Sequence, residues 1–195
     1  MNRRSGIETK KKIINAAMAV FSKQGYAKAN IREIARTAGI SVGGVYLYFR
    51  NKEELYLSLI KERIEDLVRK TELIAEPTKS PTKALTEFLR LHLDYASKHR
   101  EQILLHIREH GFTFGMETKR QFFRSQRKLI ERILVNGIRA GEFRRCDTKE
   151  MANIIMGSLR GIIFSMAVET DVSVTSKGLS EFVFKGLLKT GKRGE

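Results

Sequence analysis

The stretch that decides the fold is "IREIARTAGISVGGVYLYF", residues 31–49. Its first part places apolar residues at helical spacing and stops at a glycine after only two turns. Ser41 is a good helix cap, and it begins a second short helix over residues 42–49. Gly43 and Gly44 lie in the first turn of that helix, where each costs about 1 kcal/mol relative to alanine. The glycine pair therefore needs a reason other than helix propensity.

Two short helices joined by a tight turn that contains glycine are typical of a helix-turn-helix. Asn30 caps the first of them, which runs over residues 31–38. An earlier amphipathic helix is predicted over residues 8–24, with Gly25 as its stop. Residues 1–50 therefore hold three short helices.

Positive charge is concentrated in the same segment. The chain carries a formal net charge of +15, and residues 1–50 hold ten Lys and Arg against two Glu, a net +8. The other 145 residues hold 27 basic against 20 acidic residues, a net +7. A solvated basic surface is the plainer explanation, but the concentration at one end favours a nucleic-acid partner. A membrane-surface helix would need one long basic amphipathic segment, and the helices here are short.

A helical wheel of residues 42–49 indicates which face of the second helix points outward. Val45 and Phe49 fall within about 40° of each other and are expected to face the core. The outward residues are then Gly43, Gly44 and Leu47, with Tyr46 and Tyr48 on either side. We expect the two glycines to allow close approach to a DNA groove, so that backbone N–H groups reach phosphates or base edges. The alternative is that they let another helix of the protein pack closely.

The run "IREIARTAGISVGGVYLYFRNKEEL", residues 31–55, resembles the DNA-binding segment of the TetR family of bacterial transcriptional regulators. The resemblance lies in the helix spacing, in the Ser-x-Gly-x-x-Tyr-x-x-Phe pattern and in the Asn-Lys that follows it. It implies that the DNA-binding residues are Asn30, Ile31, Arg32, Ser41, Val42, Gly43, Gly44, Tyr46, Leu47, Tyr48 and Lys52. In this set Arg32 reaches DNA and Lys52 contacts a phosphate.

The chain departs from the family pattern at Tyr48, where many relatives have histidine. Val42 offers no hydrogen bond, where some relatives have a polar residue. Direct reading of bases by this helix is therefore expected to be sparse, which leaves more to Arg32, to backbone donors and to DNA shape.

The remaining chain is also predicted to be helical. A long helix over residues 52–75 is followed by helices over residues 82–98, 101–111, 119–140, 148–169 and 176–189. The predicted fold is all-α, with a helix-turn-helix DNA-binding domain at residues 1–50. The long helix joins it to a larger helical domain at residues 51–195, which by the resemblance binds a ligand and forms the dimer.

The sequence predicts a cytoplasmic protein with no membrane partner, because it has no N-terminal apolar run and no continuous apolar stretch of 18 residues. Its single cysteine, Cys146, excludes an internal disulfide.

The last two predicted helices are candidates for a homodimer interface. Residues 154–168 are apolar almost all round, and two glycines spaced four apart permit close contact between helices. An intramolecular core is the alternative explanation. The candidate interface residues are Ile154, Gly157, Gly161, Phe164, Phe182 and Leu187.

By the resemblance, the middle helices enclose a pocket for a small-molecule effector. The candidate lining residues are Phe88, His92, Tyr95, Ile107, His110, Phe122, Phe123 and Gln126. Their aromatic and aliphatic character predicts an apolar or amphipathic ligand. Arg108, Arg120 and Arg124 are candidates for holding an anionic end, although solvation is the ordinary role of each.

A metal alternative comes from "HIREH", residues 106–110, which fits the His-x-x-Glu-His pattern of some zinc peptidases. His106 and His110 would share a helix face, so a metal-responsive regulator stays open, and a zinc hydrolase is a more remote alternative. The sequence holds no Ser/His/Asp or Cys/His arrangement and no glycine-rich phosphate loop, so neither an enzyme nor a cofactor is predicted.

The preferred hypothesis is a ligand-responsive homodimeric repressor of transcription that a small molecule releases from its DNA operator. A ligand-independent DNA-bending protein fits the charge but not the long apolar C-terminal half. The sequence does not identify the operator, the effector or the regulated genes, nor does it distinguish repression from activation.

Overall fold

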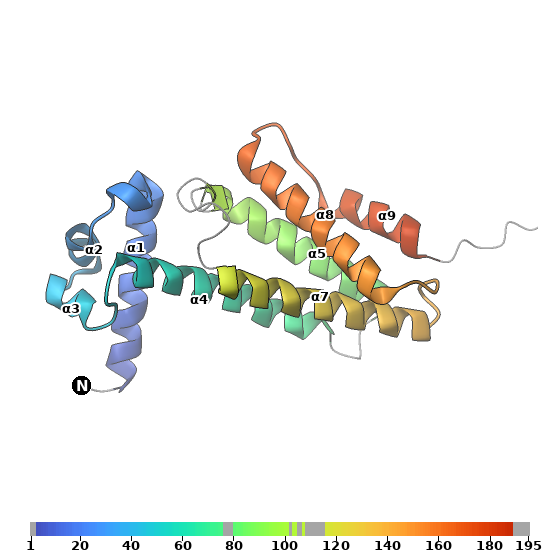
Figure 1. Ribbon diagram of the computed structural model, residues 1–195, viewed down its shortest axis with the longest axis horizontal. Helices are drawn as coiled ribbons and strands as arrows, with labels where there is room; N and C mark the ends of the chain where they lie inside the picture. The colour runs from blue at the N-terminus through green and yellow to red at the C-terminus, as the bar shows by residue number, and fades with distance from the viewer. Residues whose placement is uncertain (1–2, 76–79, 102, 105–106, 108–115, 189–195) are drawn as a thin grey trace, which may run out of the picture. The chain divides into compact units, whose positions relative to one another are not determined.

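The computed structural model of the chain describes residues 3–75, 80–101, 103–104, 107 and 116–188, and the described part is helical (Figure 1). The predicted all-α fold is confirmed. The helices are α1 (Arg3–Lys28), α2 (Ile31–Ala38), α3 (Val42–Tyr46), α4 (Lys52–Glu72), α5 (Pro81–Lys98), α7 (Met116–Arg139), α8 (Thr148–Val168) and α9 (Ser176–Leu187), with a 3-10 turn η1 (Leu73–Ala75) after α4.

The contacts divide the chain into two compact units. The first unit reaches Ile64 and includes the described residues between 101 and 116, whereas the second holds residues 65–100 and the chain from Glu117 onward. α4 therefore begins in the first unit and ends in the second. The boundary predicted from the sequence lies earlier, at residue 50, because the long helix was assigned as a link between the two domains.

The core of the first unit joins α1, α2, α3 and the start of α4. Its fully buried side chains include Ile13, Phe21, Ile34, Phe49 and Leu55. α2 begins at Asn30, whose Oδ1 accepts the Glu33 N–H at 2.9 Å, and it ends at Gly39, whose φ of 68° lies in the left-handed region. The predicted bounds of this helix are confirmed.

The helices before and after α2 differ from their predicted bounds. α1 begins earlier than residue 8 and continues to Lys28, although Gly25, with φ 81° and ψ 162°, interrupts its helical backbone where the stop was predicted. α3 ends at Tyr46 and not at residue 49. Its end is tightened because the N–H groups of Tyr48 and Phe49 both donate to the Val45 carbonyl, at 3.0 and 3.1 Å.

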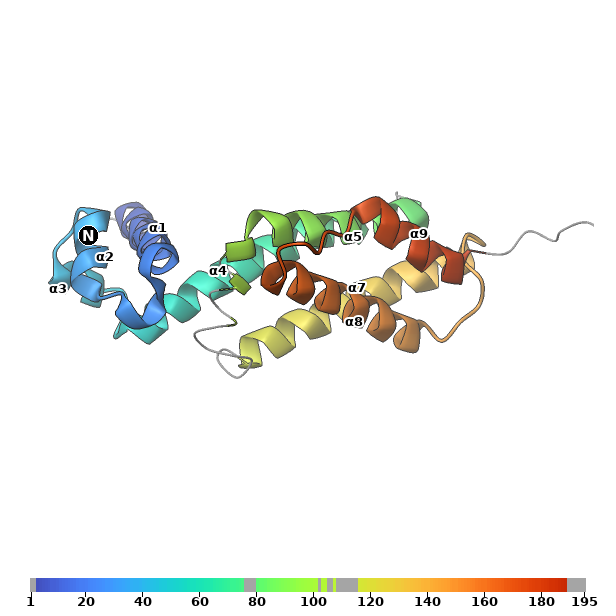
Figure 2. The same cartoon turned by 90° about the horizontal axis from the view of Figure 1, so that it is seen from above.

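The second unit has its own core, in which α5 packs beside α8 and α9 (Figure 2). Phe143 lies in the turn between α7 and α8 and packs directly on Gly137, where a Cβ atom would overlap the ring. Gly141 makes that turn with a φ of 74°. Arg144, the residue after Phe143, donates its N–H to the Leu187 carbonyl at 2.8 Å, which connects the turn to the end of α9.

α8 is long and apolar enough, by length and composition, to cross a membrane. An 18-residue window of Thr148–Val168 has a mean hydropathy of 1.5. The helix contains no uninterrupted apolar stretch of that length, because single polar residues interrupt it. Only 28% of that window is buried within the chain, so much of its apolar surface faces outward.

Candidate nucleic-acid interface

The wheel prediction for the helix after Ser41 is confirmed for its inner face. Val45 and Phe49 are buried in the core of the first unit. On the outer face Leu47 is 79% exposed and Tyr46 is 51% exposed, which is unusual for apolar and aromatic side chains of this size. Val42 is also exposed, and Tyr48 is half-buried against the core. The burial of two side chains thus fixes which residues α3 presents to solvent.

Gly43 is not required by the fold. A Cβ atom built at Gly43 meets nothing within 4 Å, so within the described residues the glycine does not make room for another helix. Its φ is not positive either, because the positive-φ glycines of the described residues are Gly25, Gly39 and Gly141. Space kept open on an exposed helix face suits an external partner that comes close to the backbone.

Gly44 has a different reason. A Cβ atom at Gly44 would lie 3.2 Å from the Ser41 Oγ and 3.7 Å from Cδ1 of Ile40. The same Ser41 Oγ accepts the Gly44 N–H at 3.0 Å and so caps the helix. Gly44 therefore leaves room for the cap, while Gly43 leaves room for something outside the chain.

At the start of α2 the structure separates the three predicted DNA-binding residues. Asn30 and Arg32 are exposed, but Ile31 is only 9% exposed and belongs to the core of the first unit. The prediction that Ile31 contacts DNA is therefore corrected, because its side chain is used in packing. Arg36 is also exposed, one helical turn after Arg32, so the two side chains share one face of α2.

The structure gives the Lys52 side chain contacts within the chain, and its predicted phosphate contact stays a prediction. Its Nζ donates to the carbonyl oxygens of Tyr26 at 2.7 Å, Ala29 at 3.0 Å and Ala27 at 3.3 Å. An ammonium group has three hydrogens, so these carbonyls engage all of its donors. The ammonium also lies 4.3 Å from the centre of the Tyr26 ring. Lys52 thus closes the carbonyl end of α1, where a cation is favourable.

An aromatic cluster surrounds this lysine. The rings of Phe21, Tyr26 and Tyr56 lie 5.0 to 5.5 Å apart, centre to centre. Burial raises the pKa of Tyr26, and the nearby charge of Glu53 raises it further. The cluster joins α1 to the start of α4 and holds the carbonyls that Lys52 binds.

The candidate ligand residues differ in burial and in the unit to which they belong. Phe88, His92 and Gln126 are buried, whereas Tyr95, Phe122 and Phe123 are half-buried. Ile107 is half-buried and groups with the first unit. Arg120 and Arg124 are exposed. His106, Arg108 and His110 lie outside the described residues, and those that are described contain no group of three or more His, Cys, Asp and Glu that could hold a metal ion.

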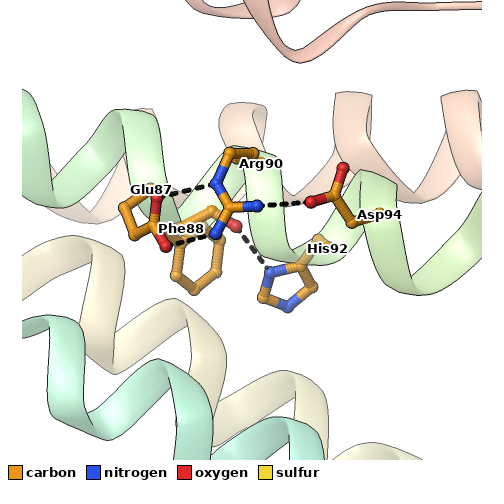
Figure 3. Close-up of polar contacts among 5 residues, drawn as sticks. All are labelled: Glu87, Phe88, Arg90, His92 and Asp94. Atoms are coloured by element: carbon orange, nitrogen blue, oxygen red, sulfur yellow. Dashed lines mark hydrogen bonds and ion pairs between the residues drawn. The ribbon is translucent and has the colours of Figure 1, made fainter.

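His92 is the buried ionisable group of α5. Its Nδ1 lies 2.9 Å from the Phe88 carbonyl oxygen, and burial lowers the pKa of the imidazole to about 4, so the ring is neutral at pH 7 (Figure 3). His92 and Phe88 project from the same side of α5 in this view. Arg90 pairs with Glu87 and Asp94, and these three side chains are largely exposed.

One predicted interface residue is wrong. Leu187 is fully buried in the core of the second unit and has no surface to offer a partner. Phe182 is 67% exposed, Ile154 51% and Phe164 40%. Gly157 and Gly161 are exposed, and a Cβ atom at either would meet nothing within 4 Å.

Comparison with known proteins identifies both parts of the chain. Residues 13–59 match the family described as bacterial regulatory proteins, tetR family, and residues 78–163 match the tetracyclin repressor-like C-terminal domain. The fatty acid metabolism regulator protein of Bacillus subtilis is 24% identical over 181 residues, which cover 90% of this chain and 93% of that protein. The probable acrEF/envCD operon repressor of Escherichia coli is 31% identical over 114 residues, covering 57% of this chain and 51% of that one.

Solved structures share the fold. SmeT, the repressor of the Stenotrophomonas maltophilia multidrug efflux pump SmeDEF, matches with a TM-score of 0.77 and 20% identity, over 93% of this chain and 91% of that chain. The transcriptional regulator FadR from Bacillus subtilis, in complex with stearoyl-CoA, matches with a TM-score of 0.71 and 24% identity, over 90% and 95%.

Replacing Gly43 with alanine should separate folding from DNA binding. We expect the melting temperature to stay the same or rise slightly, because the methyl group enters open space and alanine favours a helix by up to about 1 kcal/mol. Affinity for a selected DNA duplex should fall, because the methyl holds the backbone away from the groove. Thermal melts and duplex titrations of the same variant provide both measurements. Unchanged affinity would show that the open face of Gly43 does not meet DNA.

Replacing Lys52 with methionine should lower the melting temperature even without DNA. Three carbonyls would lose a charged donor, and a hydrogen bond to a charged group is worth about 1.5–3 kcal/mol. Lys23→Met is the matched control, because Lys23 is exposed on α1. If Lys52→Met melts like the control and loses only DNA affinity, the family-based role as a phosphate contact is right and the capping role is not.

Proposed function

Since this chain belongs to the TetR family of bacterial transcriptional regulators, we propose that it is a homodimeric repressor that a small apolar or amphipathic molecule releases from its operator. It acts in the cytoplasm on double-stranded DNA. The observation that carries the proposal is the exposed face of α3, where Leu47 and Tyr46 flank a glycine that the fold does not need.

The DNA-reading surface comprises the exposed members of the predicted set: Asn30, Arg32, Ser41, Val42, Gly43, Tyr46 and Leu47, with Tyr48 at its edge. Gly44 contributes indirectly, because its N–H donates to the Ser41 hydroxyl that caps α3. The net charge of +8 in residues 1–50 supplies long-range attraction to phosphates. Hydrogen-bonding side chains are few on α3, so DNA shape and contacts from α2 contribute much of the sequence preference.

Repression and release by a ligand are supported by the relatives. SmeT is a repressor, and it has also been solved as a complex with triclosan. The Bacillus subtilis regulator FadR has been solved with stearoyl-CoA. For the present chain the residues beyond 50 are assigned to ligand binding and dimerisation. α4 belongs to both units, so it is the covalent route by which a ligand in the second unit changes the position of the reading helix.

The homodimer is supported by the apolar surface that the chain leaves open on α8 and α9. Exposed Ile154, Phe164 and Phe182 would be costly in water as a contiguous patch. The open Cβ positions of Gly157 and Gly161 would allow the backbone of a partner helix to come close. Burial of this surface in a second copy explains why a helix this apolar is only partly buried within one chain.

DNA binding is tested by selecting duplexes from a random pool and measuring affinity for the recovered sequence across salt concentrations. We expect log K to fall steeply with log salt, by about 0.9 per phosphate contact. A scrambled duplex of equal length is the control for sequence preference. Failure of the folded protein to bind any duplex at low salt would overturn the proposed function.

Replacing Gly161 with glutamate should give a folded monomer. The new side chain enters open space in the single chain, so the protomer should fold, but the charge would be buried without a partner in the dimer. Lys128→Glu is the control, since that position is also exposed but lies on α7, outside the proposed interface. Sedimentation at micromolar concentration measures the result, and a wild-type monomer would contradict the assignment.

A further inference from the structure

Some buried side-chain atoms of the second unit have no hydrogen-bond partner among the described residues. Among them are the Nε2 atom of His92 and the Oε1 atom of Gln126. The residues are 2% and 1% exposed, so bulk water does not solvate these atoms. A buried polar group without a partner costs about 1–3 kcal/mol. Two of them among the candidate ligand residues call for an explanation.

The state of His92 follows from its other nitrogen. The Phe88 carbonyl oxygen, 2.9 Å from Nδ1, can only accept a hydrogen bond, so Nδ1 carries the proton. The neutral ring then has an unprotonated Nε2, which is a hydrogen-bond acceptor. Burial keeps the ring in this state at pH 7, because it lowers the imidazole pKa to about 4.

The orientation of Gln126 follows in the same way from its neighbour. The Ser125 hydroxyl donates its only hydrogen to the Phe122 carbonyl at 2.8 Å. Toward Gln126 this hydroxyl can therefore only accept, and the side-chain Nε2 of Gln126 lies 3.5 Å from it. The amide oxygen is left as the second unpartnered acceptor.

Aromatic rings connect the two acceptors. The ring of His92 lies 4.2 Å from that of Phe88 and 6.3 Å from that of Phe122, centre to centre. Gln126 is one helical turn after Phe122 on α7, so both share a helix face. Phe123 lies beside Phe122 at 5.2 Å. The surroundings are thus aromatic, with two acceptors as the polar groups that lack a partner.

From this arrangement we propose that the effector is an apolar molecule that presents O–H or N–H donors to His92 Nε2 and Gln126 Oε1. The inference rests on the proposed function, because it specifies the ligand of that regulatory unit. Each acceptor is satisfied by one donated hydrogen, whereas a carboxylate or an ether oxygen brings more lone pairs toward it. The aromatic faces also favour an ammonium group over an anion.

One nearby cation offers the opposite preference. Lys119 is half-buried on α7, one turn before Phe122 and Phe123, and burial lowers its pKa. No acidic partner of Lys119 is present among the described residues. An effector with a carboxylate would use this ammonium instead of the two acceptors. The experiment must therefore include an anionic probe and a Lys119 variant.

The test uses three matched probes on the full-length protein: 4-butylphenol, its methyl ether 4-butylanisole, and 4-butylbenzoate. All three probes share the butylphenyl body. They differ in one group, which is a hydroxyl donor, an ether oxygen that can only accept, or a charged carboxylate. Calorimetry gives the dissociation constant of each probe. We expect the phenol to bind about 10-fold or more tightly than either other probe, since it alone can donate a hydrogen bond to one of the two acceptors. Butyl to octyl chains extend the series to larger cavities.

Two variants assign the preference to the acceptors. His92→Asn keeps a donor near the Phe88 carbonyl but lacks the Nε2 acceptor, and Gln126→Met replaces the amide by an apolar chain of similar length. Because the phenol has one hydrogen to donate, the variant that removes the acceptor it uses should reduce the advantage of the phenol over the ether to near unity. An advantage that both variants retain would contradict the proposal. Ser180→Ala is the control, because it removes another buried, unpartnered hydroxyl of the same unit, on α9, and should leave the preference unchanged.

The proposal is overturned if the phenol and the ether bind equally, if none of the probes binds at millimolar concentration, or if the benzoate binds best and Lys119→Met abolishes its binding. Equal loss of phenol preference in Ser180→Ala would also overturn it. These outcomes leave DNA binding untouched, and DNA binding is measured separately on the selected duplex. Failure to bind DNA, with phenol preference intact, would overturn the proposed function alone.

Discussion

The burial of Val45 and Phe49 is the constraint on which the first unit depends. A helix of five residues has no stability of its own, because nucleation costs more than so few hydrogen bonds return. α3 therefore takes its orientation from Val45, which it places in the core, and from Phe49 just beyond its end. Fixing them also fixes the opposite face, so the exposure of Tyr46 and Leu47 is a consequence of packing.

Contacts at the end of α1 also help to position this exposed face. Lys52 lies at the first position of α4, yet its ammonium binds carbonyls from the segment around Tyr26 and Ala29. A single side chain thus connects the two helices that flank the helix-turn-helix. Positioning of the reading helix therefore depends on a lysine that need not touch DNA.

The second unit leaves two kinds of group without the surroundings that would stabilise them. On the outside, α8 and α9 leave large apolar side chains in water, which a second copy of the chain would cover. On the inside, His92 and Gln126 bury acceptors that lack donors. Both features reduce the stability of an isolated, unliganded chain. A regulator gains from this, because a partner that relieves such a cost in one state shifts the population toward that state.

Much of the architecture followed from the sequence alone. The apolar spacing, the caps at Asn30 and Ser41 and the stop at Gly39 are local signals, and the structure has helices bounded by them. The inward positions of Val45 and Phe49 also followed, because helical geometry alone relates them. Charge and the family pattern then indicated which end of the chain meets DNA.

The tertiary structure decided what each side chain near the site does. Ile31, Lys52 and Leu187 fit the sequence pattern as well as their neighbours did, but the first and third are used in the core and the second binds carbonyls 23 to 26 residues away. The two glycines look alike in sequence, and only the positions of Ser41 and Ile40 distinguish them. Local signals determine helices because hydrogen bonds and caps act over a few residues. Burial and pairing depend on atoms that the fold brings together from distant parts of the chain.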